Sequence, residues 1–230
     1  MVKKLFTYFI LPVCIVGLAY LCVHSVMEPV DFNKHKEVRE QVGIQRLKDI
    51  RDLQVAYKSV NNRYASTIDS LILFYKEGQI DVTKQVGSMD DSVAVANTNQ
   101  IKKKYPYLRG EKLTAKLKEA YADGINVVYK EEHKEPVRES MFTDRTDFYV
   151  DSLAYIPYCG QKIIMNSTIK TVSGVKVPLF EACMPYKQLL VGMNNQLRIN
   201  LDAERKDTGR YPGLMVGSIT APNNNAGNWE

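Results

Sequence analysis

The first apolar pattern along the chain is an uninterrupted run near its N-terminal end. Residues 5–27 contain no Asp, Glu, Lys or Arg. As an α-helix, which rises 1.5 Å per residue, this run spans about 34 Å and can cross a hydrocarbon core of about 30 Å. Tyr8 and Tyr20 lie toward its two ends, where aromatic rings favour the membrane interface. The pattern predicts a transmembrane helix that remains as an anchor, and a cleaved signal peptide is the alternative.

A second pattern, with helical spacing, follows the apolar run. Pro29 is expected to end or kink the membrane helix. Beyond it, steps of three to five residues separate apolar side chains between charged faces, which predicts an amphipathic helix over residues 34–60. Its apolar positions are Val38, Val42, Leu47, Ile50, Leu53, Tyr57 and Val60. Such a helix packs either on its own domain or on a partner helix as a coiled coil.

Two shorter helices are predicted in the next part of the chain. Residues 67–77 have an N-cap pattern before them and are expected to form a helix that ends at Gly78. Residues 79–100 have no clear periodicity and are interpreted as a loop. Residues 111–122 predict a second helix, which ends at Gly124.

Runs of β-branched and aromatic residues then replace the helical spacing. Residues 125–132, 147–159 and 161–183 are rich in these side chains and are predicted to form strands. Ser173–Gly174 lies between two such runs and predicts a hairpin turn. Pro178 marks an edge or a strand end, because proline cannot donate to a ladder. The hairpin indicates an antiparallel sheet.

A last helix completes a predicted α+β fold. Residues 185–207 carry an amphipathic stripe, and a short strand and a loose polar tail are expected after it. The fold class is α+β: a transmembrane helix that continues after a proline kink into an amphipathic helix, then an antiparallel sheet with further short helices. The predicted segments are a cytoplasmic N-terminus (1–4), a transmembrane signal anchor (5–27), the amphipathic and short helices (28–78), a loop with a basic segment (79–110) and an α+β domain outside the cytoplasm (111–230).

Composition and charge add one candidate interaction segment. The chain is 45% hydrophobic and 25% charged, which is ordinary for a globular protein, and a net charge of +5 is too small to indicate nucleic acid. Between residues 101 and 118, however, seven Lys or Arg stand against one Glu. This segment is a solvated helix face or contacts anionic lipid headgroups or an acidic partner. Its candidate interaction residues are Lys102, Lys103, Lys104, Tyr105, Tyr107 and Arg109.

The sequence contains few other residues that suggest a disulfide, a catalytic site or a metal site. Cys159 and Cys183 flank the predicted hairpin at comparable distances from its turn, so a disulfide across its base is a candidate in an oxidising compartment. The three histidines are too scattered to form a site, and no phosphate-binding loop, dinucleotide fingerprint or nucleophile elbow is present. We therefore expect no catalytic residues, no cofactor and no metal site.

A short polar turn closed by Arg-Tyr occurs twice. Arg63 and Tyr64 follow the predicted helix 34–60, and Arg210 and Tyr211 follow the predicted helix 185–207. In each case flexible polar residues end an amphipathic helix. We expect each tyrosine to bring the chain back into the core.

The order of these features resembles the type II secretion pseudopilins and type IV pilins. The residues that carry the resemblance are the apolar helix, the amphipathic helix, Ala56-Tyr57-Lys58 and residues 62–66 before a short helix with Leu71, and residues 207–212 match the pilin Gly-x-Tyr-Pro turn at a different place in the chain. The resemblance covers residues 5–75. The chain lacks the Gly before the processing site and the Glu five residues into the mature helix, which argues against prepilin processing. It also resembles single-pass envelope proteins of Bacteroidota, a likeness that implies no activity.

These observations favour a structural rather than a catalytic function. We expect a non-enzymatic, single-pass protein of the bacterial inner membrane whose C-terminal part is periplasmic. It would serve as a scaffold or pilin-like component of a membrane-associated assembly, with the lipid bilayer and other envelope proteins or copies of itself as partners and no nucleic acid. The alternative function is a cell-wall or glycan-binding module anchored in the same membrane, and an enzyme whose residues converge only in three dimensions is a third hypothesis.

Overall fold

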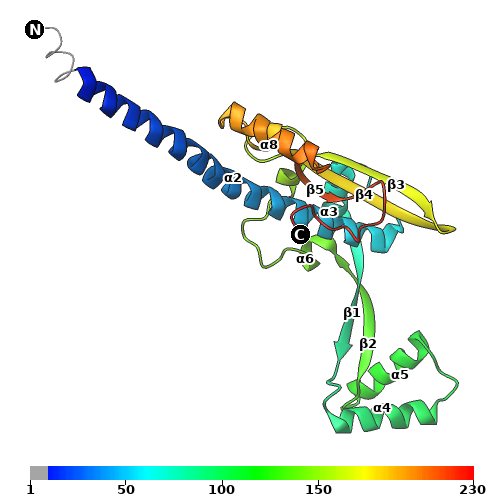
Figure 1. The fold of residues 1–230 in the computed structure, drawn as a ribbon. Coiled ribbons are helices and arrows are strands. Elements are labelled where there is room, and N and C mark those ends of the chain that lie inside the picture. Colours follow the sequence, from blue (N-terminus) through cyan, green and yellow to red (C-terminus); the bar gives the residue numbers. More distant parts are fainter. Residues whose placement is uncertain (1–9) are drawn as a thin grey trace, which may run out of the picture. The chain divides into compact units, whose positions relative to one another are not determined.

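The computed structural model describes residues 10–230 and divides the chain into two compact units (Figure 1). The first unit contains the chain up to Ile72 together with Tyr149–Glu230, and the second is Leu73–Phe148. The cytoplasmic N-terminus predicted over residues 1–4 lies outside the described residues. The boundary predicted between residues 110 and 111 falls inside the second unit. The α+β fold class is confirmed, with helices and two small antiparallel sheets.

One long helix organises the first unit. Helix α2 (Leu11–Asn61) joins the predicted membrane helix to the predicted amphipathic helix without a break at Pro29. Proline removes one backbone hydrogen bond, and here the helix continues past it rather than ending. Asn62 closes the helix in the left-handed conformation (φ 55°), and its N–H donates to the carbonyl of Lys58 at 2.8 Å.

The C-terminal half of α2 packs on a three-stranded antiparallel sheet (Figure 1). The strands are β3 (Ile164–Val172), β4 (Val175–Pro185) and β5 (Gly213–Gly217), in the order β3-β4-β5. The core between α2 and this sheet contains fully buried side chains, each of which contributes about 1.5–3 kcal/mol to folding. These include Leu47, Ile50 and Leu53 of α2 with Phe180, Met184, Leu214 and Val216 of the sheet.

The predicted hairpin is confirmed in position and turn. Val172 pairs with Val175, and Ser173 and Gly174 between them both have positive φ, as a two-residue hairpin turn requires. Pro178 pairs with Ile169, but β5 pairs only with Glu181–Pro185 of β4. One side of β4 is therefore unpaired at Pro178, which is the edge position that a proline tolerates.

Two predicted elements of this unit are wrong. Residues 147–159 do not form a strand: they contain the 3-10 helix η2 (Val150–Ala154) and a single bridge between Tyr155 and Lys162. The helix predicted over 185–207 is broken into α7 (Tyr186–Leu189) and α8 (Asn195–Asp207). The break lies where Gly192 has a φ of +80° and Asn194 caps α8 by accepting from the N–H of Leu197.

The C-terminal tail is packed rather than loose. Asn228 donates to the carbonyl of Gly213 at 2.9 Å and accepts from the N–H of Met215 at 3.1 Å. Arg51 of α2 forms an ion pair with Glu230 at 2.6 Å. These contacts fix the tail along β5 and the end of α2, so the polar composition alone was a poor guide to its order.

The second unit is a two-stranded ribbon that carries a helical lobe. Strand β1 (Gln79–Val86) pairs with β2 (Tyr129–Pro136) from Gln79↔Pro136 to Val86↔Tyr129. The predicted loop over residues 79–100 is thus wrong, since it forms β1 and most of α4 (Ser92–Lys104). Asp91 caps α4 by accepting from the N–H groups of Val93 and Ala94.

A small core holds this lobe together. Helix α5 (Glu111–Ala122) contributes Leu117, which packs with the buried Val127 and Tyr129. Ile101 of α4 and Leu113 of α5 pack against the same cluster. The helix predicted over 111–122 and its end before Gly124 (φ +83°) are confirmed. Helix α3 (Ile68–Glu77) spans the boundary between the units, as predicted for 67–77, and the single turn α6 (Val137–Ser140) follows β2.

Candidate interaction surfaces

The N-terminal half of α2 presents apolar side chains to its surroundings. Val13, Val16 and Val26 are 71%, 69% and 66% exposed, and the most apolar window of the helix has a mean hydropathy of 1.7 with no part of it buried. An α-helix of this length and composition is compatible with a single-pass membrane anchor. A hydrophobic surface of this extent is not stable in water unless something covers it.

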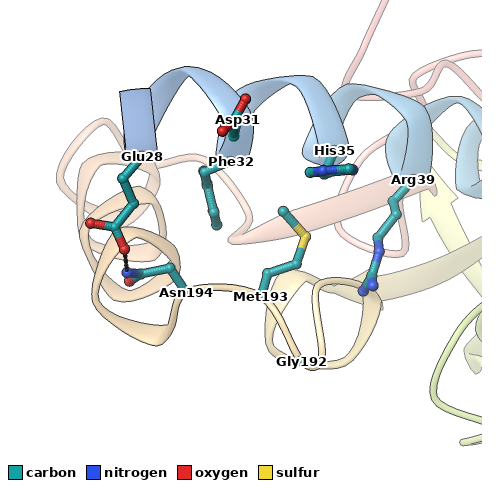
Figure 2. Close-up of a pocket in the computed structure, with 8 residues that line it drawn as sticks. All are labelled: Glu28, Asp31, Phe32, His35, Arg39, Gly192, Met193 and Asn194. Carbon is teal, nitrogen blue, oxygen red and sulfur yellow. Dashed lines mark hydrogen bonds between the residues drawn. The ribbon is translucent and has the colours of Figure 1, made fainter. Parts of the chain in front are cut away.

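A pocket of about 340 Å³ lies beside α2 just beyond this apolar segment (Figure 2). Phe32 and His35 point from α2 toward Met193 in the loop between α7 and α8. Glu28 accepts a hydrogen bond from the amide of Asn194 at 2.5 Å, which closes one end of the pocket (Figure 2). Its other lining residues are Asp31, Arg39 and Gly192.

Arg39 lies at the other end of the pocket, and its guanidinium forms hydrogen bonds with the backbone of the same unit. Its guanidinium donates to the carbonyls of Leu189 and Val191, at 3.1 and 2.7 Å, and lies 4.6 Å from the centre of the Tyr158 ring. Because these carbonyls lie at the last residue of α7 and just beyond it, the positive charge is favourably placed there. The polar groups of the pocket thus clamp the α7–α8 loop onto α2, and this arrangement has a structural function.

A buried tyrosine ties the same loop region to α2. The hydroxyl of Tyr186 donates to the carboxylate of Glu40, and the guanidinium of Arg205 lies 5.2 Å from its ring. Burial, and secondarily the Glu40 carboxylate, raises the pKa of Tyr186 well above its usual value. Tyr186 therefore stays protonated and acts as a donor, and it joins α2, α7 and α8 at one point.

The structure places the predicted basic segment at the junction of α4 and α5 in the lobe. Lys102, Lys103 and Lys104 occupy the last turn of α4, where positive charge is favourable. The Tyr105 ring packs edge-on to Tyr107, with a centroid distance of 6.3 Å, and Tyr107 is 75% exposed.

Part of this basic charge is free for a partner. Lys116 and Lys118 pair with Glu119 and Glu131, each at 2.5 Å. Among the described residues, Lys102, Lys103 and Arg109 are exposed and make no side-chain hydrogen bond or ion pair. The six residues predicted for this segment, Lys102, Lys103, Lys104, Tyr105, Tyr107 and Arg109, therefore lie together on one loop and the adjoining helix end.

The predicted disulfide is not formed. Cys159 and Cys183 are both free, and Cys183 pairs across the hairpin with Ile164, not with Cys159. Cys159 precedes β3 by five residues, in a turn where its Sγ accepts from the N–H of Gln161 at 3.4 Å. The comparable distances of the two cysteines from the turn did not predict this, because the pairing of the strands ends before Cys159 is reached.

At the repeated Arg-Tyr turn, Tyr64 is in the core as predicted, whereas Tyr211 is only partly buried. Tyr64 is buried with its ring 4.7 Å from that of Phe180, and Tyr211 lies beside Cys183. Both tyrosines therefore pack on β4 from opposite ends of the chain. Both arginines are exposed: Arg63 lines a polar pocket next to Tyr64, and Arg210 follows the end of α8.

Comparison of the chain with protein-family models, curated proteins and solved structures found no match. Within the described residues no cluster of three or more His, Cys, Asp or Glu could hold a metal ion. The hydrogen bonds from Arg39 to the carbonyls of Leu189 and Val191 were not predicted from the sequence, because a cation that binds backbone carbonyls has no sequence motif.

Proposed function

We propose that this protein is a single-pass envelope protein that acts as a scaffold or pilin-like component of a membrane-associated assembly, with both units in the periplasm. The observation that carries the proposal is the continuity of α2, whose first half is exposed and apolar and whose second half forms the core of the first unit. A single helix thereby couples a membrane segment to a folded domain. The unpaired basic residues of the lobe supply a surface for an acidic partner in such an assembly.

The anchor is tested by a charge in the middle of the apolar segment. Leu18→Arg places a cation at the centre of the proposed span, which costs about 2.5–3.5 kcal/mol on insertion scales. Val38→Arg is the matched control, because Val38 is 61% exposed on the same helix, close to the 62% of Leu18, but lies beyond the span. We expect Leu18→Arg to shift the protein from the membrane fraction and Val38→Arg to leave it there.

Retention of Leu18→Arg in the membrane at the wild-type level would contradict the anchor. The orientation is measured separately with a C-terminal alkaline phosphatase fusion, which is active only outside the cytoplasm, and activity of a cytosolic reporter alone would contradict it. Chemical crosslinking in native membranes tests the assembly, with discrete higher-mass products expected. Recovery of monomer alone would overturn the scaffold proposal.

A further inference from the structure

A polar pocket of about 290 Å³ lies at the end of α2, within the first unit. Three parts of the chain build it: the last turns of α2 with the Arg63-Tyr64 turn, the start of α3, and the middle of β3. Its volume is close to the lower limit for a small-molecule site. The lining residues are Tyr57, Arg63, Tyr64, Ser66, Ser70, Ser167, Thr168 and Ile169.

Several of the polar side chains that line this pocket form no hydrogen bond with other described groups of the protein. Within residues 10–230, the Arg63 guanidinium has no hydrogen bond and no ion pair. The hydroxyls of Ser66 and Ser167 likewise make no side-chain hydrogen bond in that range. This distinguishes the pocket from the one at Arg39, whose guanidinium is satisfied by backbone carbonyls. A free guanidinium binds a carboxylate or phosphate with two parallel hydrogen bonds.

The pocket also has a fixed wall and a positive surrounding. Tyr64 is held by a hydrogen bond between its hydroxyl and Asn225, and its ring by contact with Phe180. Lys58 lies 5.1 Å from the centre of the same ring. No carboxylate is among the lining residues, and Asp69 at the start of α3 is paired with Lys162 at 3.1 Å. The electrostatic environment therefore favours an anion.

From this geometry we infer that the pocket binds a monosaccharide-sized polyol that carries one anionic group, either a phosphate or a carboxylate. Arg63 binds the anionic group, and the hydroxyls of Ser66 and Ser167 exchange hydrogen bonds with the hydroxyls of the ligand. A serine hydroxyl both donates and accepts, which suits a sugar whose hydroxyls do the same. The inference does not depend on the membrane anchor, since every lining residue belongs to the folded part of the first unit.

Isothermal titration calorimetry on the full-length protein in detergent micelles tests the inference with four probes: glucose 6-phosphate, glucuronic acid, glucose and inorganic phosphate. We expect binding of at least one of the two anionic sugars with a dissociation constant in the millimolar range. Glucose and inorganic phosphate should each bind at least about tenfold more weakly than that sugar. Whichever anionic sugar binds more tightly identifies the anionic group.

Arg63→Gln and Arg210→Gln are matched variants, because the two arginines occupy equivalent positions in the two copies of the Arg-Tyr turn and only Arg63 lines this pocket. Arg63→Gln should weaken binding of the anionic sugar at least about tenfold, and Arg210→Gln should bind like the wild type. Circular dichroism confirms that both variants are folded. Absence of binding by both anionic sugars, or equal affinity of the two variants, would overturn the inference. Glucose binding as tightly as the anionic sugar would exclude the arginine contact, and inorganic phosphate binding as tightly would exclude the polyol.

Discussion

At the scale of single residues, burial makes the thiol of Cys183 unreactive. Its side chain is 4% exposed, and burial, followed by the effect of the Glu181 carboxylate, raises the pKa of its thiol to about 12. Since only the thiolate is nucleophilic, Cys183 should be inert near neutral pH. Cys159 lies in a turn and is partly exposed. The two cysteines that the sequence suggested as a pair thus have different environments.

We predict that iodoacetamide at pH 8 modifies Cys159 in the folded protein and leaves Cys183 unmodified until denaturant is added. Peptide mass spectrometry measures the two sites separately. Cys159→Ser serves as a control, and in that variant Cys183 should remain unreactive. A disulfide would instead protect both cysteines until a reductant is added, and that result would contradict the free thiols.

The same thiol affects stability at high pH. Its pKa is raised above the ordinary value of 9.0, so the folded state binds the proton more tightly than the unfolded state. The resulting stabilisation is fully present below pH 9 and is lost as the pH rises toward about 12. Tyr186 and Tyr211, whose pKa values are also raised mainly by burial, change stability in the same direction.

At the scale of elements, one buried amide joins α2 to the turn before α3. Gln54 is fully buried, and its Nε2 donates to the carbonyl of Ala65 at 3.0 Å while its Oε1 accepts from the N–H of Ala65 at 2.9 Å. Its Nε2 also lies 3.2 Å from the sulfur of Met165 on β3. A single side chain therefore satisfies both backbone groups of a buried residue and holds the Arg63-Tyr64 turn in place.

Gln54→Met keeps the shape of this side chain and removes its hydrogen bonds. Leaving the N–H and C=O of Ala65 unpaired costs about 1–3 kcal/mol for each group. We expect the free energy of unfolding, measured by urea denaturation in micelles, to fall by about 2 kcal/mol or more. Gln41→Met on the exposed face of α2 is the control and should change it by less than about 0.5 kcal/mol. Equal effects of the two variants would contradict the bridging function of Gln54.

The elements that could be predicted from the sequence are those with local signals. The Ser173–Gly174 turn and the helix ends near Gly78 and Gly124 need only neighbouring residues. Strand β1 was missed because its sequence, QIDVTKQV, is polar and its pairing residues lie about 50 positions away. The break before α8 was missed because Leu190 and Met193 match a helical stripe, although Gly192 interrupts it.

The candidate sites also differ in whether their residues are neighbours in the sequence. The basic segment is continuous in sequence, so its composition was enough to predict that its residues gather. The Arg63 pocket combines residues that are about 100 positions apart, from the end of α2 and from β3. Its hydroxyl groups belong to a common residue type, and no spacing rule could have placed Ser167 beside Arg63. Only the tyrosine of the repeated turn indicated that this part of the chain returns to the core.

At the scale of the whole molecule, the second unit is inserted into the first. The first unit is formed by chain on both sides of the insertion, with α2 from one side and the whole β3-β4-β5 sheet from the other. The ribbon of β1 and β2 brings the two ends of the helical lobe together, because Val86 pairs directly with Tyr129. A lobe whose ends are paired can be removed without requiring the rest of the chain to rearrange.

We therefore predict that replacing residues 87–128 with Asn-Gly, a sequence that favours two-residue hairpins, leaves the first unit folded. Its thermal unfolding midpoint by circular dichroism should stay within about 2 °C of the wild type, and the protein should remain in the membrane fraction. Crosslinked products that depend on the basic segment should disappear. The full-length variant with Lys102, Lys103 and Arg109 all changed to Gln separates loss of charge from loss of the lobe, and it should lose the same products. A midpoint lowered by more than about 5 °C would show instead that the first unit needs the lobe for its stability.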